Sequence, residues 1–329
     1  MFGPREPKDG LCTPEITILA RRLVGLVCRK GGLDCPLISA EEAEPILERL
    51  ASDPTVTIRL CSDADCIPHY TRLSDADWAA QDPEDVLNRK RDLDVLQKLG
   101  LCPGDTRRAR WLIELLFERI HTPWELCAYD TPGWEGCALA RSGAYEKVRA
   151  AGSPAMVYFR SDQERAEFRA GNALAIAQGE RIYMRPHHIM CMACWYRGGE
   201  AEGLRPNDTL AEILQRIQAD PEVPITLVEG QCEACDCCDG FHPETGRCVH
   251  GGGLIRDLKK DLDCFQVLGL MPGATLPARE MLELIFDRIG STTEICGYGS
   301  GEVTGFEWRV CGGPGGNQGY AKTRRTGML

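Results

Sequence analysis

Arg91-Asp-Leu-Asp-Val-Leu-Gln-Lys-Leu-Gly100 recurs 169 residues later as Lys260-Asp-Leu-Asp-Cys-Phe-Gln-Val-Leu-Gly269. The match runs without gaps over residues 91–120 and 260–289, where 17 of 30 positions are identical. A second block, residues 46–60, matches residues 213–227 at 8 of 15 positions, and the two blocks come in the same order in both halves. A repeat of this length is too long for a solenoid and predicts a tandem duplication.

Local signals place similar elements in each half. Ser39 and the glutamate three residues later have capping-box spacing, which predicts a helix over residues 40–50. The β-branched segments 55–58 and 224–227 are typical of strands. Gly100 and Gly269 each follow an apolar helical pattern, so each is expected to end a helix.

These signals predict an α+β fold of two homologous domains related by a pseudo-twofold axis. Each domain is expected to contain short strands, several helices and cysteine-bearing loops. The expected boundaries are 1–150 for the first repeat, 151–180 for a connecting segment and 181–329 for the second repeat. The glycine-rich tail from Gly312 is expected to be mobile or ordered by a partner.

Composition limits the classes of function. The formal charge of −11 argues against binding of a phosphate backbone. It suits an acidic protein that docks on a basic redox partner, and solubility alone is the alternative explanation. No apolar run of signal-peptide or membrane-spanning kind occurs, so we expect a cytoplasmic protein that binds neither nucleic acid nor membrane. Eighteen cysteines in 329 residues are far more than a cytoplasmic fold needs, and in a reducing compartment they favour metal binding over disulfides.

Cysteines that recur in both halves are the first candidates for ligands. Four positions correspond, which gives one predicted cofactor-binding quartet per domain: Cys28, Cys66, Cys127 and Cys137 in the first, and Cys194, Cys232, Cys296 and Cys311 in the second. Cys61 is an alternative to Cys66. Four thiolates can hold one [4Fe-4S] or [2Fe-2S] cluster or one zinc ion, and ligands this far apart in sequence favour a cluster. The alternative is that these thiols only fill the core.

The second half carries further soft ligands. Between residues 185 and 248 there are seven cysteines and three histidines, two of which, His187 and His188, precede Cys191 by four and three residues. Pro186 suits the first turn of a helix. On that helix, Cys191 and Cys194 would share a face, with His187 and His188 on or near it. The extra cysteines are predicted metal ligands for a third cluster: Cys191, Cys235, Cys237, Cys238 and Cys248.

His187 and His188 are candidates for ligation, for hydrogen bonding to a cluster sulfur or for proton delivery in catalysis. A capping or core role is the alternative. The four remaining cysteines in this scheme are ordinary thiols: Cys12, Cys35, Cys102 and Cys264. The recurring pairs Asp92-x-Asp94 and Asp261-x-Asp263 are expected on the solvated side of a helix.

The stretch Arg185-Pro-His-His-Ile-Met-Cys191, with Ile225-Thr-Leu-Val-Glu-Gly230 and Cys248 after it, resembles a short, uncharacterised prokaryotic family described as iron–sulphur-binding. Its members begin with Arg-Pro-His-His-Leu-Leu-Cys. The resemblance covers roughly residues 182–275. It implies ligand roles for Cys191, Cys235, one of Cys237 and Cys238, and Cys248. The first half departs from it, with Ala20-Arg-Arg in place of Pro-His-His and Gly25 in place of Cys191.

The sequence therefore predicts an iron–sulphur protein with two or three [4Fe-4S] clusters, acting in electron transfer or as a redox subunit of a partner enzyme in an oxygen-poor setting. One alternative is an iron–sulphur reductase or lyase with an open cluster near His187 and His188. A second alternative is a zinc-stabilised interaction scaffold.

Overall fold

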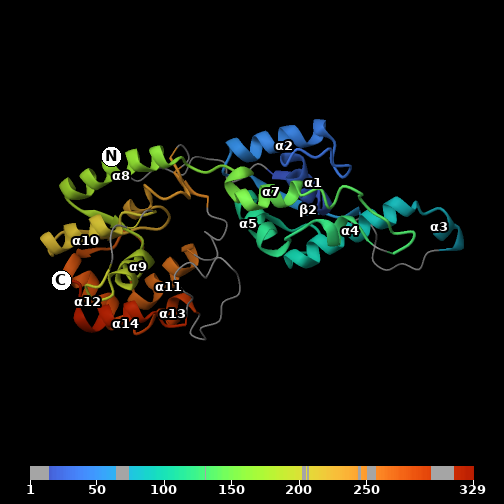
Figure 1. Ribbon diagram of the computed structural model, residues 1–329. Helices are drawn as coiled ribbons and strands as arrows, with labels where there is room; N and C mark the ends of the chain where they lie inside the picture. Colours follow the sequence, from blue (N-terminus) through green and yellow to red (C-terminus); the bar gives the residue numbers. More distant parts are fainter. Residues whose placement is uncertain are drawn as a thin grey trace. The chain divides into compact units, whose positions relative to one another are not determined.

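Figure 1 shows the computed structural model of the chain, residues 1–329. The structure describes residues 15–63, 74–129, 131–201, 205, 207–243, 246–249, 257–297 and 315–329. The chain divides into two compact units, Lys8–Phe159 and Arg160–Leu329, which we call the N-terminal unit and the C-terminal unit.

The N-terminal unit combines helices with one small sheet. In chain order its elements are β1 (Glu15–Leu19), α1 (Ala20–Lys30), α2 (Ala40–Ser52), β2 (Thr57–Cys61), α3 (Asp75–Ala79), α4 (Pro83–Leu99), β3 (Thr106–Arg108), α5 (Ala109–Arg119), α6 (Trp124–Cys127), α7 (Ala144–Ala151) and the 3-10 turn η2 (Ser153–Ala155). The sheet order is β1-β2-β3. Strand β2 runs parallel to β1, with Ile16 opposite Ile58, and antiparallel to β3.

The C-terminal unit has the same order of core elements after one added helix. Its elements are α8 (Asp162–Gln178), β4 (Ile182–Met184), α9 (Pro186–Tyr196), α10 (Leu210–Ala219), β5 (Pro224–Leu227), the 3-10 turn η3 (Glu233–Cys235), β6 (Phe241–His242), β7 (Arg247–Cys248), α11 (Lys259–Leu268), β8 (Thr275–Pro277), α12 (Ala278–Arg288), α13 (Thr292–Cys296) and α14 (Gln318–Thr326). The sheet order β4-β5-β8 again joins a parallel pair to an antiparallel pair.

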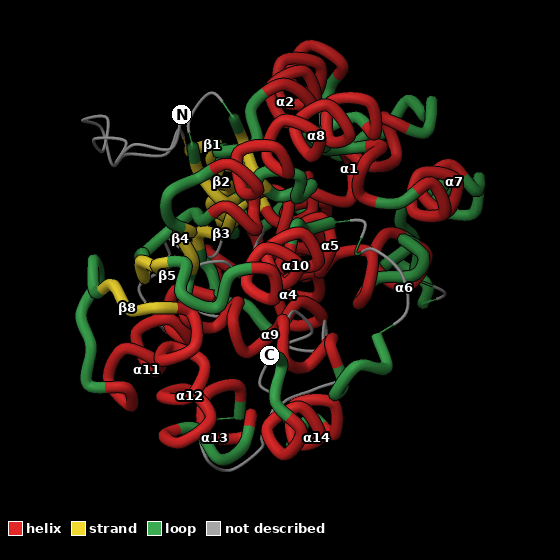
Figure 2. The backbone as a smooth tube through the Cα atoms, turned by 90° about the vertical axis from the view of Figure 1, so that its left-hand side faces the viewer, coloured by secondary structure: helices red, strands yellow, loops and turns green. Residues whose placement is uncertain are grey.

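The α+β class is confirmed, and Figure 2 shows the short strands in yellow among the red helices. The duplication itself remains a prediction from the sequence. Its local signals correspond to observed ends of elements. Ser39 accepts a hydrogen bond from the Glu42 amide at 3.2 Å, and both halves of the capping box are formed. Gly100 and Gly269 end α4 and α11 with φ of 68° each, a left-handed conformation that favours glycine.

Both units close on a buried tyrosine. Tyr145 of α7 donates its hydroxyl hydrogen bond to the Ile120 carbonyl at 2.9 Å, and Tyr320 of α14 donates to the Ile289 carbonyl at 2.9 Å. Each ring also packs edge-on against a phenylalanine of the preceding long helix. A late helix therefore seals the core in each unit.

Two expectations about the chain path were wrong. Residues 315–329 include α14, which packs along α9 (Figure 1), and Thr323 donates a hydrogen bond to the Ala193 carbonyl at 2.7 Å. Burial of Tyr320 and Met328 orders this segment of the expected mobile tail. Residues 162–178, placed in the connecting segment, form α8, which packs on α10 inside the C-terminal unit.

The expectation of a solvated face was wrong for Asp92 and Asp261, both of which are 0% exposed. Asp92 accepts from the Arg21 amide at 2.8 Å and pairs with the Arg21 guanidinium. Asp261 likewise accepts a hydrogen bond from a backbone amide in the first turn of α9, that of His187, at 3.4 Å. A carboxylate at a helix N-terminus meets unpaired amides and a positive dipole end, which makes its burial tolerable.

Among the described residues, no helix is both long and apolar enough to cross a bilayer.

Candidate metal centre

The first turn of α9 is anchored by one buried acid. Pro186 occupies the first helical position, as predicted, because its missing N–H is not needed there. Asp261 of α11 receives the Arg185 guanidinium at 2.6 Å and His187 Nδ1 at 2.6 Å. Burial would raise the pKa of Asp261, but His187 and Arg185 lower it below the usual range. The ionised carboxylate thus fixes the rotamers of both neighbours.

His188 turns to a different group. Its Nδ1 lies 3.1 Å from Cys232 Sγ and 4.0 Å from Cys235 Sγ, and the two sulfurs are 3.8 Å apart. All three donor atoms lie within 4.8 Å of one another, and this is the sole group of three or more His, Cys, Asp or Glu donors of that compactness in the described part of the chain. We call these three residues the His188 site. His187 lines a cavity together with Cys191, one helical turn away, and His188 contacts the cysteines of the following loop.

Charge at the His188 site favours thiolate. Burial and a hydrogen bond with Cys235 raise the pKa of Cys232, whereas the hydrogen bond from Cys232, followed by His188 and Arg185, lowers the pKa of Cys235. The hydrogen bond between the two sulfurs therefore favours thiolate at Cys235 over thiolate at Cys232. The Arg185 amide also donates to Cys232. A cation that binds both sulfurs displaces any thiol proton that they carry.

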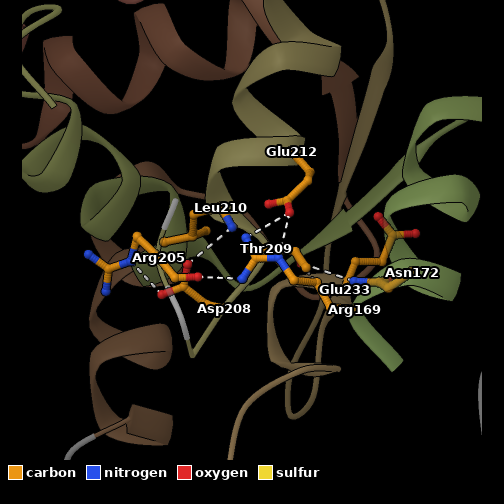
Figure 3. A network of polar contacts seen from close by, with 8 residues as sticks. All are labelled: Arg169, Asn172, Arg205, Asp208, Thr209, Leu210, Glu212 and Glu233. Carbon is orange, nitrogen blue, oxygen red and sulfur yellow. Dashed lines mark hydrogen bonds and ion pairs between the residues drawn. The ribbon is translucent and has the colours of Figure 1, made fainter. Parts of the chain in front are cut away.

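The backbone of the cysteine loop is held by buried polar side chains. Figure 3 shows Asn172 of α8 and Thr209 pointing to Glu233 in the turn between Cys232 and Cys235. The Asn172 amide donates to the Glu233 carbonyl at 2.6 Å, and Thr209 donates to the same oxygen at 2.9 Å. These two hydrogen bonds fix the orientation of the Glu233 peptide group, and with it the turn that carries both cysteines.

Arg160 secures the next part of the loop. Its guanidinium donates to the carbonyls of Asp236 at 2.6 Å and Cys238 at 3.0 Å, and its face covers the Phe168 ring at 4.5 Å. The side chain is buried. A loop fixed by a buried cation is preorganised for ligands before any metal arrives.

A second cysteine group surrounds a small cavity of about 10 Å³, room for one water molecule. Cys191 and Cys194 of α9 line it as predicted neighbours on one helical face, together with His187 and Cys296 at the end of α13. We call it the Cys191 cavity. Cys264, expected to be an ordinary thiol, is near enough for Cys191 and Cys296 to act on its charge.

Cys232 of the predicted second quartet contacts Cys235 and His188, whereas Cys194 and Cys296 of the same quartet line the Cys191 cavity with Cys191. The quartet itself stays a prediction, because Cys311 lies outside the described residues. Sequence position after the shared strand does not show the contact between Cys232 and Cys235. The η3 turn redirects the chain between Cys232 and Cys235.

The other predicted ligands of the cysteine loop are not among the three donors of the His188 site. Cys237 is buried beside Arg169, whose charge opposes the effect of burial, and its pKa is raised to about 12. The Cys238 sulfur accepts from the Gly240 amide at 3.3 Å, and Cys248 pairs with Phe241 in the β6-β7 hairpin. Cys66 and Cys311 lie outside the described residues.

In the N-terminal unit, three predicted ligands come together with one that was not predicted. Cys28, Cys127 and Cys137 are close enough to influence one another's charge, and Cys35 hydrogen bonds to Cys28. Cys35 has no counterpart in the repeat, so comparison of the halves could not select it.

Three further residues, which support the His188 site and α9, were not predicted from the sequence: Asn172, Arg160 and Asp261. Their roles depend on partners that are distant in sequence.

No family model, no curated protein and no solved structure matches the chain. The resemblance to iron–sulphur-binding proteins therefore stays a prediction, and function follows from the chemistry of the cysteine groups.

Proposed function

We propose that the chain is a metal-binding redox protein: the His188 site holds a single metal ion, and iron–sulphur clusters on the other cysteine groups carry electrons for a partner enzyme. The compactness of His188, Cys232 and Cys235 supports the first part most directly. For a tetrahedral ion with sulfur ligands at about 2.3 Å, two sulfurs are separated by about 3.8 Å. The Cys232 and Cys235 sulfurs are 3.8 Å apart.

The donor set also suits a soft ion. Two thiolates and one neutral imidazole are ligands that zinc and iron accept, and hard ions such as Mg²⁺ prefer oxygen. Cys232 and Cys235 are almost fully buried, so competition from water is weak. Three protein donors from a helix and a loop leave the fourth position of a tetrahedral ion for water, substrate or a further side chain.

The redox part rests on the number and grouping of thiols. Cys191, Cys194 and Cys296 are half-buried and line one cavity, and cysteine sulfurs grouped in this way are typical cluster ligands. In each turnover a cluster would accept one electron from a reduced partner protein, which is oxidised by one electron, and pass it to an acceptor. No substrate bond breaks in this step.

A second candidate is catalysis at the His188 site. Within the described residues the site has three close donors, and an ion held by three protein ligands can polarise a molecule bound at its fourth position. The Cys191 cavity lies beside His187, whose Nδ1 is held by Asp261. A reductase or lyase would use the ion for substrate binding and the clusters as the electron supply.

Metal analysis tests the proposal. Protein purified without oxygen is assayed for iron, zinc and acid-labile sulfide, and the ion of the His188 site is replaced by Co²⁺ to record thiolate-to-metal absorption. We expect Cys232→Ser and Cys235→Ser each to lose about one ion per chain and most of the cobalt absorption. Cys102→Ser is the matched control, since Cys102 is exposed and belongs to none of the groups.

Full metal content in both site variants would refute the His188 site. A protein with zinc alone and no sulfide would refute the redox part and leave the zinc-stabilised scaffold.

A further inference from the structure

Four thiols gather in the N-terminal unit from three separate segments. Cys28 lies in α1, Cys35 in the loop after it, Cys127 at the end of α6 and Cys137 in the loop before α7. All four are thiols and none is in a disulfide. Cys28, Cys35 and Cys127 are at most 5% exposed, and Cys137 is half-buried. We call them the Cys28 group.

The backbone brings the last two together. The Cys137 amide donates to the Cys127 carbonyl at 2.5 Å. Gly136 permits this approach, since a Cβ there would stand only 1.8 Å from that carbonyl oxygen. Any other residue at this position would push the Cys137 loop away from α6, so the contact depends on glycine.

Cys35 places its sulfur where the C-terminal unit has Cys191. Gly25 is the sixth residue of α1, as Cys191 is of α9, and Cys28 and Cys194 are each the ninth. A Cβ built on Gly25 would lie 3.5 Å from Cys35 Sγ. The thiol that α9 supplies from its own side chain is thus supplied to α1 by the following loop. Both units keep a sulfur at this point of the helix surface from different residues.

A buried cation faces the same thiols. Arg91 is 5% exposed and donates to the Asn88 side chain at 2.8 Å and the Cys127 carbonyl at 3.2 Å. Its Nε has no hydrogen-bond partner, and within the described residues no carboxylate pairs with it. A buried guanidinium without a counter-charge is costly. Negative charge on the sulfurs would supply the missing counter-charge, and Arg91 already stabilises thiolate at Cys127 and Cys35.

A metal centre binds cysteines as thiolates, so its binding to the Cys28 group releases the thiol protons. The thiolates would then place negative charge beside the buried Arg91 guanidinium.

We infer that Cys28, Cys35, Cys127 and Cys137 are the four ligands of an iron–sulphur cluster in the N-terminal unit, with Arg91 as its buried counter-charge. The inference deepens the redox part of the proposed function and replaces Cys66 by Cys35. A cluster fits better than one ion because the sulfurs of the Cys28 group do not converge within 4.8 Å as those of the His188 site do. In a cluster each cysteine binds its own iron, so wider spacing is needed.

The test uses the full chain, purified without oxygen and refilled with Fe²⁺ and sulfide. We expect Cys35→Ser to lose one cluster's share of iron and sulfide, and Cys102→Ser to match the wild type. Cys232→Ser should lose only the ion of the His188 site, so failure of that site and failure of the cluster are separate results. Unchanged iron and sulfide in Cys35→Ser would overturn the inference, as would stoichiometric zinc without sulfide at the Cys28 group.

Alkylation of the wild type keeps the inference testable if Cys35→Ser does not fold. Iodoacetamide labelling with mass spectrometry should find Cys137, the half-buried member of the group, protected in the loaded protein. Cys137 should become reactive after iron is stripped with a chelator. Equal labelling of Cys137 before and after stripping would contradict ligation.

Discussion

Replacing Asp261 by asparagine is expected to destabilise the C-terminal unit strongly, although the side chain keeps its size. Asp261 is 0% exposed and accepts Arg185 Nε and His187 Nδ1, each at 2.6 Å. An asparagine amide can accept only at its oxygen, so its NH₂ group, a donor, would face either Arg185 or His187. Arg185, itself 4% exposed, then loses the carboxylate with which it forms its ion pair. Removing one partner of such a pair costs about 3–5 kcal/mol.

The matched control is Asp263→Asn on the same helix. Asp263 pairs with Lys259 one turn away, and that lysine side chain is 39% exposed. Exposed pairs at this spacing contribute about 0.3–0.5 kcal/mol. The loss in the free energy of unfolding should therefore be about ten times larger for Asp261→Asn than for Asp263→Asn, although the two substitutions look alike in sequence. Urea unfolding of metal-free protein, followed by far-UV circular dichroism, measures both losses. A loss below about 1 kcal/mol for Asp261→Asn would refute the buried ion pair that we describe.

Further outcomes follow from the same contacts. Tyr320→Phe and Tyr145→Phe should cost similar amounts, about 1–3 kcal/mol, because each leaves a buried carbonyl unpaired, and thermal unfolding of the two variants checks this. Burial lowers the pKa of His187 to about 4, so unfolded chains bind its proton first. The stability of metal-free protein should therefore be full above about pH 6.5 and fall by up to about 3 kcal/mol toward pH 4, and the His187→Gln variant should lose this part of the pH dependence in urea titrations. Asn172→Ala should weaken Co²⁺ binding at the His188 site about 10–100-fold by freeing the turn that carries the cysteines, whereas Gln163→Ala on the exposed side of α8 should leave it unchanged in a competition titration.

Elements with a local stop or start were predictable from the sequence. Ser39, Gly100 and Gly269 act through their own backbone and near neighbours, so the signal is complete within a few residues. The strand at 224–227 was found at its observed bounds, whereas β2 begins two residues later than the predicted 55–58 and runs to Cys61. Sheet pairing, which decides the latter, is not a local property.

The sequence predicted the residue types of the site but not which residues lie together. The abundance of cysteine indicated metal, but the partition among groups depends on turns that redirect side chains, such as η3 between Cys232 and Cys235. Asp261 looked like a solvated residue because nothing on α11 reveals that the start of α9 packs against it. Comparison of the halves likewise cannot detect Cys35, which supplies a sulfur from a different position of the chain.

The packing of α14 along α9 has a consequence for the order in which the two units fold during synthesis. Thr323 and Tyr320 close over the helix that carries His188 and Cys191, so this helix lacks its cover until residues beyond 317 have left the ribosome. The N-terminal unit has all its described helices by residue 151. During synthesis the N-terminal unit can thus fold before the C-terminal unit is complete. A truncation before Gln318 would expose the face of α9 that α14 covers to chaperones and proteases.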